Sequence, residues 1–263
     1  MVKTMNKPKV IIVRTAGTNC DYELQLAFEI CGADVDRVHI NELIENKDKI
    51  LSYDILAVPG GFSYGDDIAS GKILANELKN KLGDNIKKFA LSKKPIIGIC
   101  NGFQILVKMG LLPEPDKFEQ TATLSYNDSN KFECRWVYLK TEKTDGNTKC
   151  IWTKNLPDII SLPVAHGEGK FVADDNVLKE IEKNNQVVFR YCTADGKYPN
   201  YPLSPNGSLN QIAGICNKDG NIFGLMPHPE RYIYKLQHPA RQGYDDKFGW
   251  GKKIFQNAID FLK

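Results

Sequence analysis

The amino-acid sequence predicts an α/β protein with a doubly wound, mostly parallel sheet, helices on both faces and an antiparallel edge. Strand-like and helix-like segments alternate through the first half, which is typical of a parallel sheet. The second half contains strand-like segments and a hairpin turn signal, which predict antiparallel pairing at one edge. No repeat, low-complexity segment or flexible linker divides the 263 residues, so we expect one domain over 1–263.

The elements of the first half follow from hydrophobic periodicity and from turn residues. Short apolar runs indicate buried strands, and amphipathic stretches indicate helices. The expected strands are 9–13, 33–40, 53–61 and 94–99. The expected helices are 19–32, 41–51, 73–82, 84–93 and 102–112, with Asn19 or Asp21 near the first N-cap and Gly32 after that helix ends. This order places helices on both faces of a parallel sheet.

The second half changes character. Strands are expected at 132–140, 186–192, 210–217 and 221–228, and a closing amphipathic helix at 250–263. The sequence "NKDGN" between the last two strands is a hairpin turn signal. The segments 59–72, 113–131 and 232–249 are loop-like, and long loops in compact domains tend to carry function.

Composition excludes several classes of protein. The chain is 42% hydrophobic and 25% charged, which is ordinary for a soluble globular protein, and its net charge of +3 gives no support for nucleic-acid binding. It contains no apolar run of about 18 residues, so no membrane span is expected. The apolar stretch near the N-terminus is too short for a signal peptide, so we expect a cytoplasmic protein.

The seven cysteines are widely spaced, without a CxxC pair, so neither a zinc site nor any other metal site is expected. In a reducing compartment we expect free thiols, most of them buried as small apolar residues.

Cys100 is the candidate exception, because Gly98-Ile99-Cys100-Asn101-Gly102 has the form of a nucleophile elbow. Flanking glycines let a strand and a helix pack closely around a strained residue. The side chain then projects at the carboxyl end of the strands, where α/β sheets bind ligands. The helix N-terminus there favours thiolate over thiol. The alternative is that the glycines only allow close packing and Cys100 is a small buried apolar residue. A partner base elsewhere in the chain would distinguish a nucleophile from this alternative.

His228 is the candidate base. An extended chain places residues i and i+2 on one side, so within "MPHPER" Glu230 can orient the imidazole of His228. Pro227 and Pro229 bias this stretch away from helix. Cys100, His228 and Glu230 would then be nucleophile, base and orienting carboxylate. Otherwise His228 is a satisfied histidine at a strand end. His39 ends a strand and reads as structural, and His238 lies in a charged loop at the surface.

An oxyanion hole needs two backbone donors. The N–H of Asn101 follows the nucleophile and is one candidate. The second should come from the loop after the strand at 53–58, where Gly60 and Gly61 permit close approach to a ligand, so we expect Gly61 or Phe62 to supply it. The alternative for this loop is a simple turn that ends the strand.

Five blocks together carry a family resemblance: "PGGFSYGD", "GICNGFQIL", "AHGEGKF", "SPNGSLNQIAGI" and "GLMPHPER". The chain resembles class I (triad) glutamine amidotransferases and, among them, the glutaminase subunits of phosphoribosylformylglycinamidine synthase. The resemblance runs from about residue 8 to 231 and resumes in the last helix. It implies the flavodoxin-like fold of that class.

The resemblance also implies the chemistry. Cys100 would attack the side-chain amide of glutamine, His228 would transfer protons, and Glu230 would hold His228. Ammonia would pass to a separate synthase subunit, which uses ATP and Mg to convert formylglycinamide ribonucleotide to formylglycinamidine ribonucleotide in purine biosynthesis. Some relatives need a small third subunit. No cofactor is expected in this chain, which lacks the GxxxxGK[ST] phosphate-binding motif.

The resemblance further implies a glutamine-binding set of Gly60, Gln104, His166, Gly167 and Glu168. The block "SPNGSLNQIAGI" would either face the partner or build a turn and a strand. The segment 232–249 is longer than expected for a short family member, and it suits an interface or a solvated loop equally. Its notable side chains are Tyr232, Tyr234, His238, Arg241 and Tyr244.

Two other functions fit parts of the pattern. A stand-alone cysteine hydrolase of the same fold, such as a γ-glutamyl hydrolase, would share the cysteine and histidine but would need no ATP-using partner. A non-catalytic regulatory subunit could keep the fold, but the presence of all three triad residue types argues against it.

Overall fold

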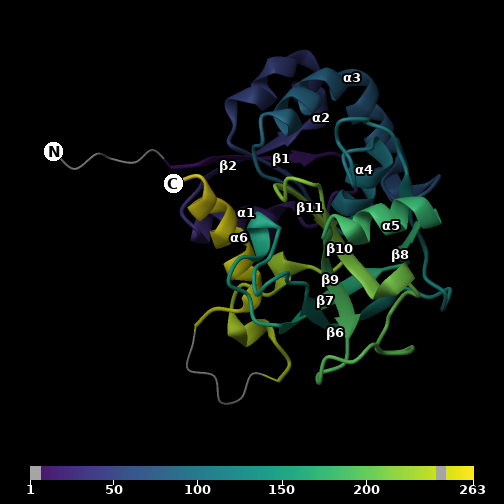
Figure 1. The fold of residues 1–263 in the computed structure, drawn as a ribbon. Helices are drawn as coiled ribbons and strands as arrows, with labels where there is room; N and C mark the ends of the chain where they lie inside the picture. Colours follow the sequence, from purple (N-terminus) through teal and green to yellow (C-terminus); the bar gives the residue numbers. More distant parts are fainter. Residues whose placement is uncertain (1–6, 241–246) are drawn as a thin grey trace.

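A computed structural model describes residues 7–240 and 247–263. A nine-stranded sheet runs through this part of the chain in the order β2-β1-β3-β4-β11-β10-β9-β6-β7, with helices packed on both faces (Figure 1). The buried apolar side chains form one cluster that includes residues from Val10 in the first strand to Ile259 in the last helix.

One part of the sheet is parallel, as predicted. Its strands are β2 (Asp34–His39), β1 (Lys9–Arg14), β3 (Ile55–Val58), β4 (Ile96–Ile99) and β11 (Ile222–Leu225). β3, β4 and β11 are buried along their whole length, which explains their uninterrupted apolar sequences. The carboxyl ends of parallel strands meet at one edge, so the loops after β1, β3, β4 and β11 lie together.

The antiparallel part is larger than the expected edge. It comprises β10 (Ile212–Cys216), β9 (Val187–Cys192), β6 (Glu133–Thr141) and β7 (Ile159–His166). β10 and β11 form the predicted hairpin. Two further strands, β5 (Ala122–Tyr126) and β8 (Glu168–Ala173), pair with each other in a separate ribbon.

The helices form two layers. α1 (Asp21–Ile30) and α6 (Trp250–Phe261) pack against each other on one face, while α2 (Ile40–Glu45), α3 (Lys72–Leu91) and α4 (Asn101–Met109) cover the opposite face (Figure 1). α5 (Asp175–Lys183) lies beside the antiparallel strands (Figure 1). No helix in the described residues has the length and hydrophobicity needed to span a membrane.

Several elements differ from the sequence prediction. The segments 73–82 and 84–93 form one helix, α3, because Gly83 is tolerated in its interior. The expected helix at 41–51 divides into α2 and a 3₁₀ turn, Lys47–Ser52.

Strands β5, β7 and β8 and helix α5 were not predicted. β5 lies inside the segment expected to be a loop, 113–131, and that expectation was wrong for these residues. β7 contains Pro163, which argues against a strand, but β7 is an edge strand, where proline is tolerated.

Candidate active site

Cys100 stands at a sharp turn between β4 and α4. Its backbone has φ 51° and ψ −106°, a strained conformation for a residue with a side chain. Its N–H donates to Leu225 O (2.8 Å), and its carbonyl oxygen accepts from Gln104 N (3.1 Å). The turn is therefore held from both sides, as expected of a nucleophile elbow.

The flanking glycines are required by packing. A Cβ atom on Gly102 would lie 1.9 Å from Val58 O, and one on Gly98 would lie 2.6 Å from Gly102 O. Strand and helix approach so closely here that no side chain fits at either position, which agrees with the predicted reason for the glycines.

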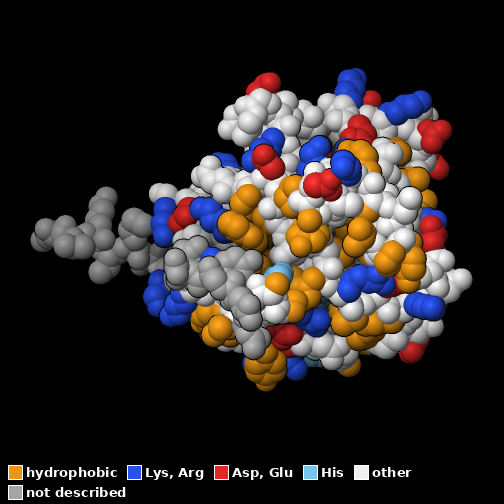
Figure 2. Space-filling model, turned by 90° about the horizontal axis from the view of Figure 1, so that it is seen from below, with side chains coloured by type: hydrophobic (Ala, Val, Ile, Leu, Met, Phe, Trp, Pro, Cys, Tyr) orange, Lys and Arg blue, Asp and Glu red, His pale blue; other side chains and the backbone are white. Residues whose placement is uncertain are grey.

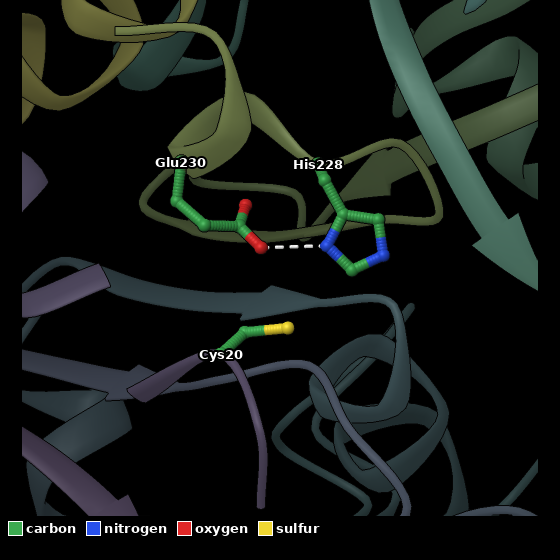
Figure 3. A group of neighbouring side chains, drawn as sticks. All are labelled: Cys20, His228 and Glu230. Atoms are coloured by element: carbon green, nitrogen blue, oxygen red, sulfur yellow. Dashed lines mark hydrogen bonds and ion pairs between the residues drawn. The ribbon is translucent and has the colours of Figure 1, made fainter. Parts of the chain in front are cut away.

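His228 follows β11 and forms a buried pair with Glu230. The Nδ1 atom of His228 lies 2.6 Å from Glu230 Oε1, and both side chains are almost fully buried (Figure 3). The backbone that brings the two side chains together differs from the predicted extended chain. β11 ends at Leu225, and Pro229–Arg231 is a 3₁₀ turn, not an extended chain. Proline fits the first position of such a turn, where no N–H is needed.

The imidazole of His228 lies near Cys100, since both side chains would contact a Cβ atom on Gly60. The Nε2 atom of His228 is buried and makes no hydrogen bond within the described residues. Burial lowers the pKa of His228, but the Glu230 charge and the nearby Cys100 sulfur outweigh this and raise the pKa well above its ordinary value. The Cys100 thiol donates to Ala165 O (3.7 Å). A protonated imidazole beside a cysteine is the arrangement that nucleophilic catalysis requires.

One expected oxyanion donor, Asn101, follows Cys100 directly, and the other belongs to the loop after β3, where a Cβ atom on Gly60 would lie 3.5 Å from Cβ of Cys100. Asn101 is the first residue of α4, so its N–H has no partner within the helix. Phe62 N–H already donates to Gly17 O (2.8 Å). Gly61, at φ +139°, is therefore the better candidate for the second donor.

The side chains of Asn101 and Gln104 connect the elbow to its surroundings. Asn101 accepts from Ser63 N (3.3 Å) and donates to Asp66 Oδ1 (3.2 Å) and Gln104 Oε1 (3.0 Å). Gln104 donates to Glu168 O (2.6 Å). Both ends of the Gln104 amide are thus engaged within the protein, so Gln104 braces the wall of the site.

The His166-Gly167-Glu168 segment lies beside the same helix. His166 is buried, and its Nδ1 atom lies 3.1 Å from Asn127 Oδ1. Burial, followed by the charge of His228, lowers the pKa of His166 to about 3, so this imidazole is neutral. The carboxylate of Glu168 accepts from Ser70 N. The structure thus gathers the predicted glutamine-binding residues near Cys100, and their role in binding stays a prediction.

The block "SPNGSLNQIAGI" supports this segment from behind. Asn206 donates to Gly169 O (2.9 Å), and the hydroxyl of Ser208 accepts from Phe171 N (2.9 Å). Both side chains are buried. This geometry favours the turn-building alternative for the block.

Cys20 and Arg231 lie beside the site and were not predicted as site residues from the sequence. Cys20 precedes α1, is 1% exposed, and accepts a hydrogen bond from Arg231 Nη2 (3.0 Å). Its sulfur points at the His228–Glu230 pair (Figure 3). The available signal was its position in the loop after β1, at the edge where Cys100 and His228 also lie.

Cys20, His228 and Glu230 place one donor atom each within 4.8 Å of one another, a spacing that a metal ion could use. Their chemistry fits a metal poorly. The His228–Glu230 hydrogen bond already occupies two of the donors, and the Arg231 guanidinium places a positive charge beside the third. We therefore interpret His228 and Glu230 as a hydrogen-bonded pair, with Cys20 as its neighbour and not as a metal ligand.

The remaining candidates lie elsewhere. His39 accepts from Asn41 N (3.2 Å) and caps α2, so it is structural, as expected. His238 is only partly exposed, because its ring packs on Trp136 (4.3 Å between centroids) and Nε2 contacts Ser161 Oγ (3.1 Å). Tyr232 packs on the same Trp136. Arg241 and Tyr244 lie outside the described residues.

The chain is similar in sequence and fold to known proteins. The chain is 47% identical over 246 residues to the "Phosphoribosylformylglycinamidine synthase subunit PurQ" of Methanococcus maripaludis, covering 92% of this chain and 88% of that one. It is 47% identical over 262 residues to the protein of the same name from Dehalococcoides mccartyi, with coverage of 98% and 99%.

Two solved structures are similar to this chain in fold. A chain in "Structure of PurLQS from Thermotoga maritima" aligns with a TM-score of 0.74 and 36% identity, covering 98% of this chain and all of that one. A putative GMP synthase subunit from Thermoplasma acidophilum, at 16% identity and a TM-score of 0.57, shares the fold. Residues 7–262 match the model of the CobB/CobQ-like glutamine amidotransferase domain. The chain therefore belongs to the CobB/CobQ-like glutamine amidotransferase family.

Proposed function

We propose that this chain hydrolyses glutamine to glutamate and ammonia through Cys100, His228 and Glu230. The observation that carries the proposal is the meeting of two adjacent strand ends. β4 delivers a cysteine at a strained turn, and β11 delivers an imidazole held by a carboxylate at 2.6 Å. The family match and the 47% identity to PurQ proteins agree with it.

The proposed reaction uses these residues. Cys100 sulfur attacks the side-chain amide carbon of glutamine, and the N–H groups of Asn101 and Gly61 stabilise the oxyanion. The imidazolium of His228 gives its proton to the leaving nitrogen, so ammonia departs and a γ-glutamyl thioester remains. His228 then takes a proton from water, which attacks the thioester. The Cys100 thiolate leaves and the new carboxylic acid ionises to glutamate, so the thiolate and the imidazolium are regenerated. Glu230 stabilises the charged imidazole throughout.

The ammonia is consumed by a separate synthase subunit. We propose that this partner uses ATP and Mg to convert formylglycinamide ribonucleotide to formylglycinamidine ribonucleotide, with a small third subunit in the same complex. The name PurLQS of the Thermotoga structure supports an assembly of this kind. The face in Figure 2 carries many exposed hydrophobic side chains with Lys and Arg among them, a composition suited to contact with another protein.

We also propose a cytoplasmic location and no cofactor within this chain. All seven cysteines are free, and each lies in the described residues. Free thiols in this number suit a reducing compartment.

The test is glutamate release from glutamine by the purified chain, alone and with its synthase partner, ATP and formylglycinamide ribonucleotide. Low activity alone that rises strongly in the complex supports an ammonia source controlled by its partner. Fast hydrolysis that ignores partner and nucleotide indicates a stand-alone hydrolase with the same triad. No release in either state would refute the proposed activity.

A further inference from the structure

We infer that Cys20, together with Arg231, positions the His228–Glu230 pair for catalysis. The inference rests on the proposed glutaminase function, because it concerns the same imidazole. Cys20 occupies the N-cap position of α1, but its side chain does not cap the helix. Its N–H donates to Gly60 O (3.2 Å), and its carbonyl accepts from Leu24 N (3.1 Å). The backbone therefore fixes the thiol at the active-site edge of the sheet.

The thiol lies between a cation and the imidazole–carboxylate pair. Arg231 Nη2 donates to Cys20 Sγ at 3.0 Å, and the sulfur lies within 4.8 Å of a nitrogen of His228 and an oxygen of Glu230 (Figure 3). A Cβ atom on Gly60 would lie 3.2 Å from this sulfur and 2.8 Å from the His228 ring. Cys20 is thus in the same packed group as the triad.

We infer that Arg231 competes with His228 for the carboxylate of Glu230. Glu230 Oε1 binds His228, while Oε2 is buried without a hydrogen bond in the described part of the chain. A guanidinium is the natural bidentate partner of a carboxylate. Arg231 follows Glu230 directly. Burial lowers the pKa of Arg231, but Cys20 and the Glu230 charge raise it by more. The guanidinium therefore lies within electrostatic range of both groups.

Cys20 keeps the Arg231 guanidinium away from the Glu230 carboxylate. By accepting the hydrogen bond of Arg231, the sulfur holds the guanidinium away from the carboxylate, and Glu23 contacts the same guanidinium (3.7 Å). Glu230 then keeps its full charge for His228. If Arg231 instead bound Glu230, the imidazolium would lose that stabilisation, and its orientation would loosen.

A thiol suits this position because it can stay neutral. Burial raises the pKa of Cys20. The neighbouring His228 opposes this effect, and the Glu230 charge acts with burial. The neutral sulfur accepts from Arg231 without adding a negative charge that would compete with Glu230. An aspartate here would bind Arg231 more strongly, but its charge would also draw the imidazolium.

The experiment measures glutaminase kinetics of the complex with its synthase partner for Cys20→Ala, Cys20→Ser and the double variant Cys20→Ala/Arg231→Met. Cys20→Ala should lower kcat about tenfold with little change in KM for glutamine. Cys20→Ser should retain most of kcat, because a hydroxyl also accepts from Arg231. Cys31→Ala, a buried free thiol at the far end of α1, is the matched control and should be unchanged.

The pH profile separates positioning from structural damage. In Cys20→Ala the basic limb of kcat should move to lower pH, because His228 shares Glu230 with Arg231 and loses its proton earlier. The double variant should return the limb toward its original place. The titratable groups around His228 are Cys20, Cys100, His166 and Glu230, and Arg231 is bonded to Cys20. The substitutions change only Cys20 and Arg231.

Unchanged kcat and an unmoved basic limb in Cys20→Ala would overturn the inference. So would a loss of kcat that the double variant does not relieve and that leaves the limb in place, because the thiol would then be merely structural. A wild-type complex that releases no glutamate refutes the proposed function itself, and the inference falls with it.

Discussion

The Cε1 atom of His228 lies 2.8 Å from the position that a Cβ atom would occupy on Gly60. The same position is 3.2 Å from the sulfur of Cys20 and 3.5 Å from Cβ of Cys100. Gly60 therefore leaves the space in which three functional side chains meet, and even a methyl group there would displace the imidazole.

Gly60→Ala should impair catalysis more than stability. The backbone of Gly60 is not among those with positive φ, so alanine is not strained there. The displaced His228 should lower kcat by about 10- to 100-fold, while the thermal midpoint moves by only a few degrees. Gly83→Ala, where the added Cβ would meet the Phe118 ring at 3.4 Å, is the control and should keep full activity. A fully active Gly60→Ala would mean that the ring is not held as described.

Cys100→Ala should abolish glutamine hydrolysis and leave the fold intact, because the thiol is the proposed nucleophile and alanine is smaller than cysteine. Glutamate release and circular dichroism check both statements. Cys134→Ala, which removes an exposed thiol on β6, should behave like the unsubstituted chain. More than a trace of activity in Cys100→Ala would exclude this cysteine as the nucleophile.

His228→Ala should slow glutamine hydrolysis by about 10²-fold or more, the usual scale for an acid–base group. Steady-state glutamate release in the complex is the measurement. His39→Ala is the matched control, because His39 only caps α2 and should affect stability alone. A rate equal to that of the unsubstituted chain would remove His228 from the mechanism.

His166 should make the protein less stable in acid. Its pKa is lowered to about 3 in the folded state, against about 6.5 in the unfolded chain. Below pH 6.5 the unfolded state therefore binds a proton that the native state does not. This contribution falls by about 1.4 kcal/mol per pH unit as the pH drops toward 3.

Urea unfolding at pH 7, 6 and 5 checks the prediction. His166→Gln should lose stability less steeply than the unsubstituted chain over this range. The pKa of His228 is raised, so its contribution is fully present below about pH 6.5 and declines as the pH rises toward its folded value. His228 is present in both proteins, so it should not disturb the comparison. Equal slopes for the two proteins would contradict the assignment.

The parts of this fold that the sequence predicted depend on local signals. The apolar runs of β1, β3 and β4, the turn before β11 and the glycines around Cys100 can each be interpreted within a few residues of chain. The family resemblance rests on the same short blocks, and the comparisons confirm it.

The parts that were missed depend on contacts between distant segments. β7 is a strand because β6 pairs with it, despite Pro163, and β5 and β8 pair only with each other. Cys20 looked like one more buried thiol, since nothing within α1 shows that Arg231 and His228 will lie against it. The 3₁₀ turn at Pro229–Arg231 was also missed, although the side-chain pairing that it produces was correctly inferred.

The place of β11 in the sheet has a consequence for the synthesis of the protein. β11 lies between β4 and β10, so it is the strand that joins the parallel part to the antiparallel part, and it is made late. Until it inserts, the thiol of Cys100 has no base, because His228 arrives with the same strand. A nascent chain on the ribosome therefore carries no competent site. The capacity to consume glutamine appears only when β11 has paired with β4 and β10.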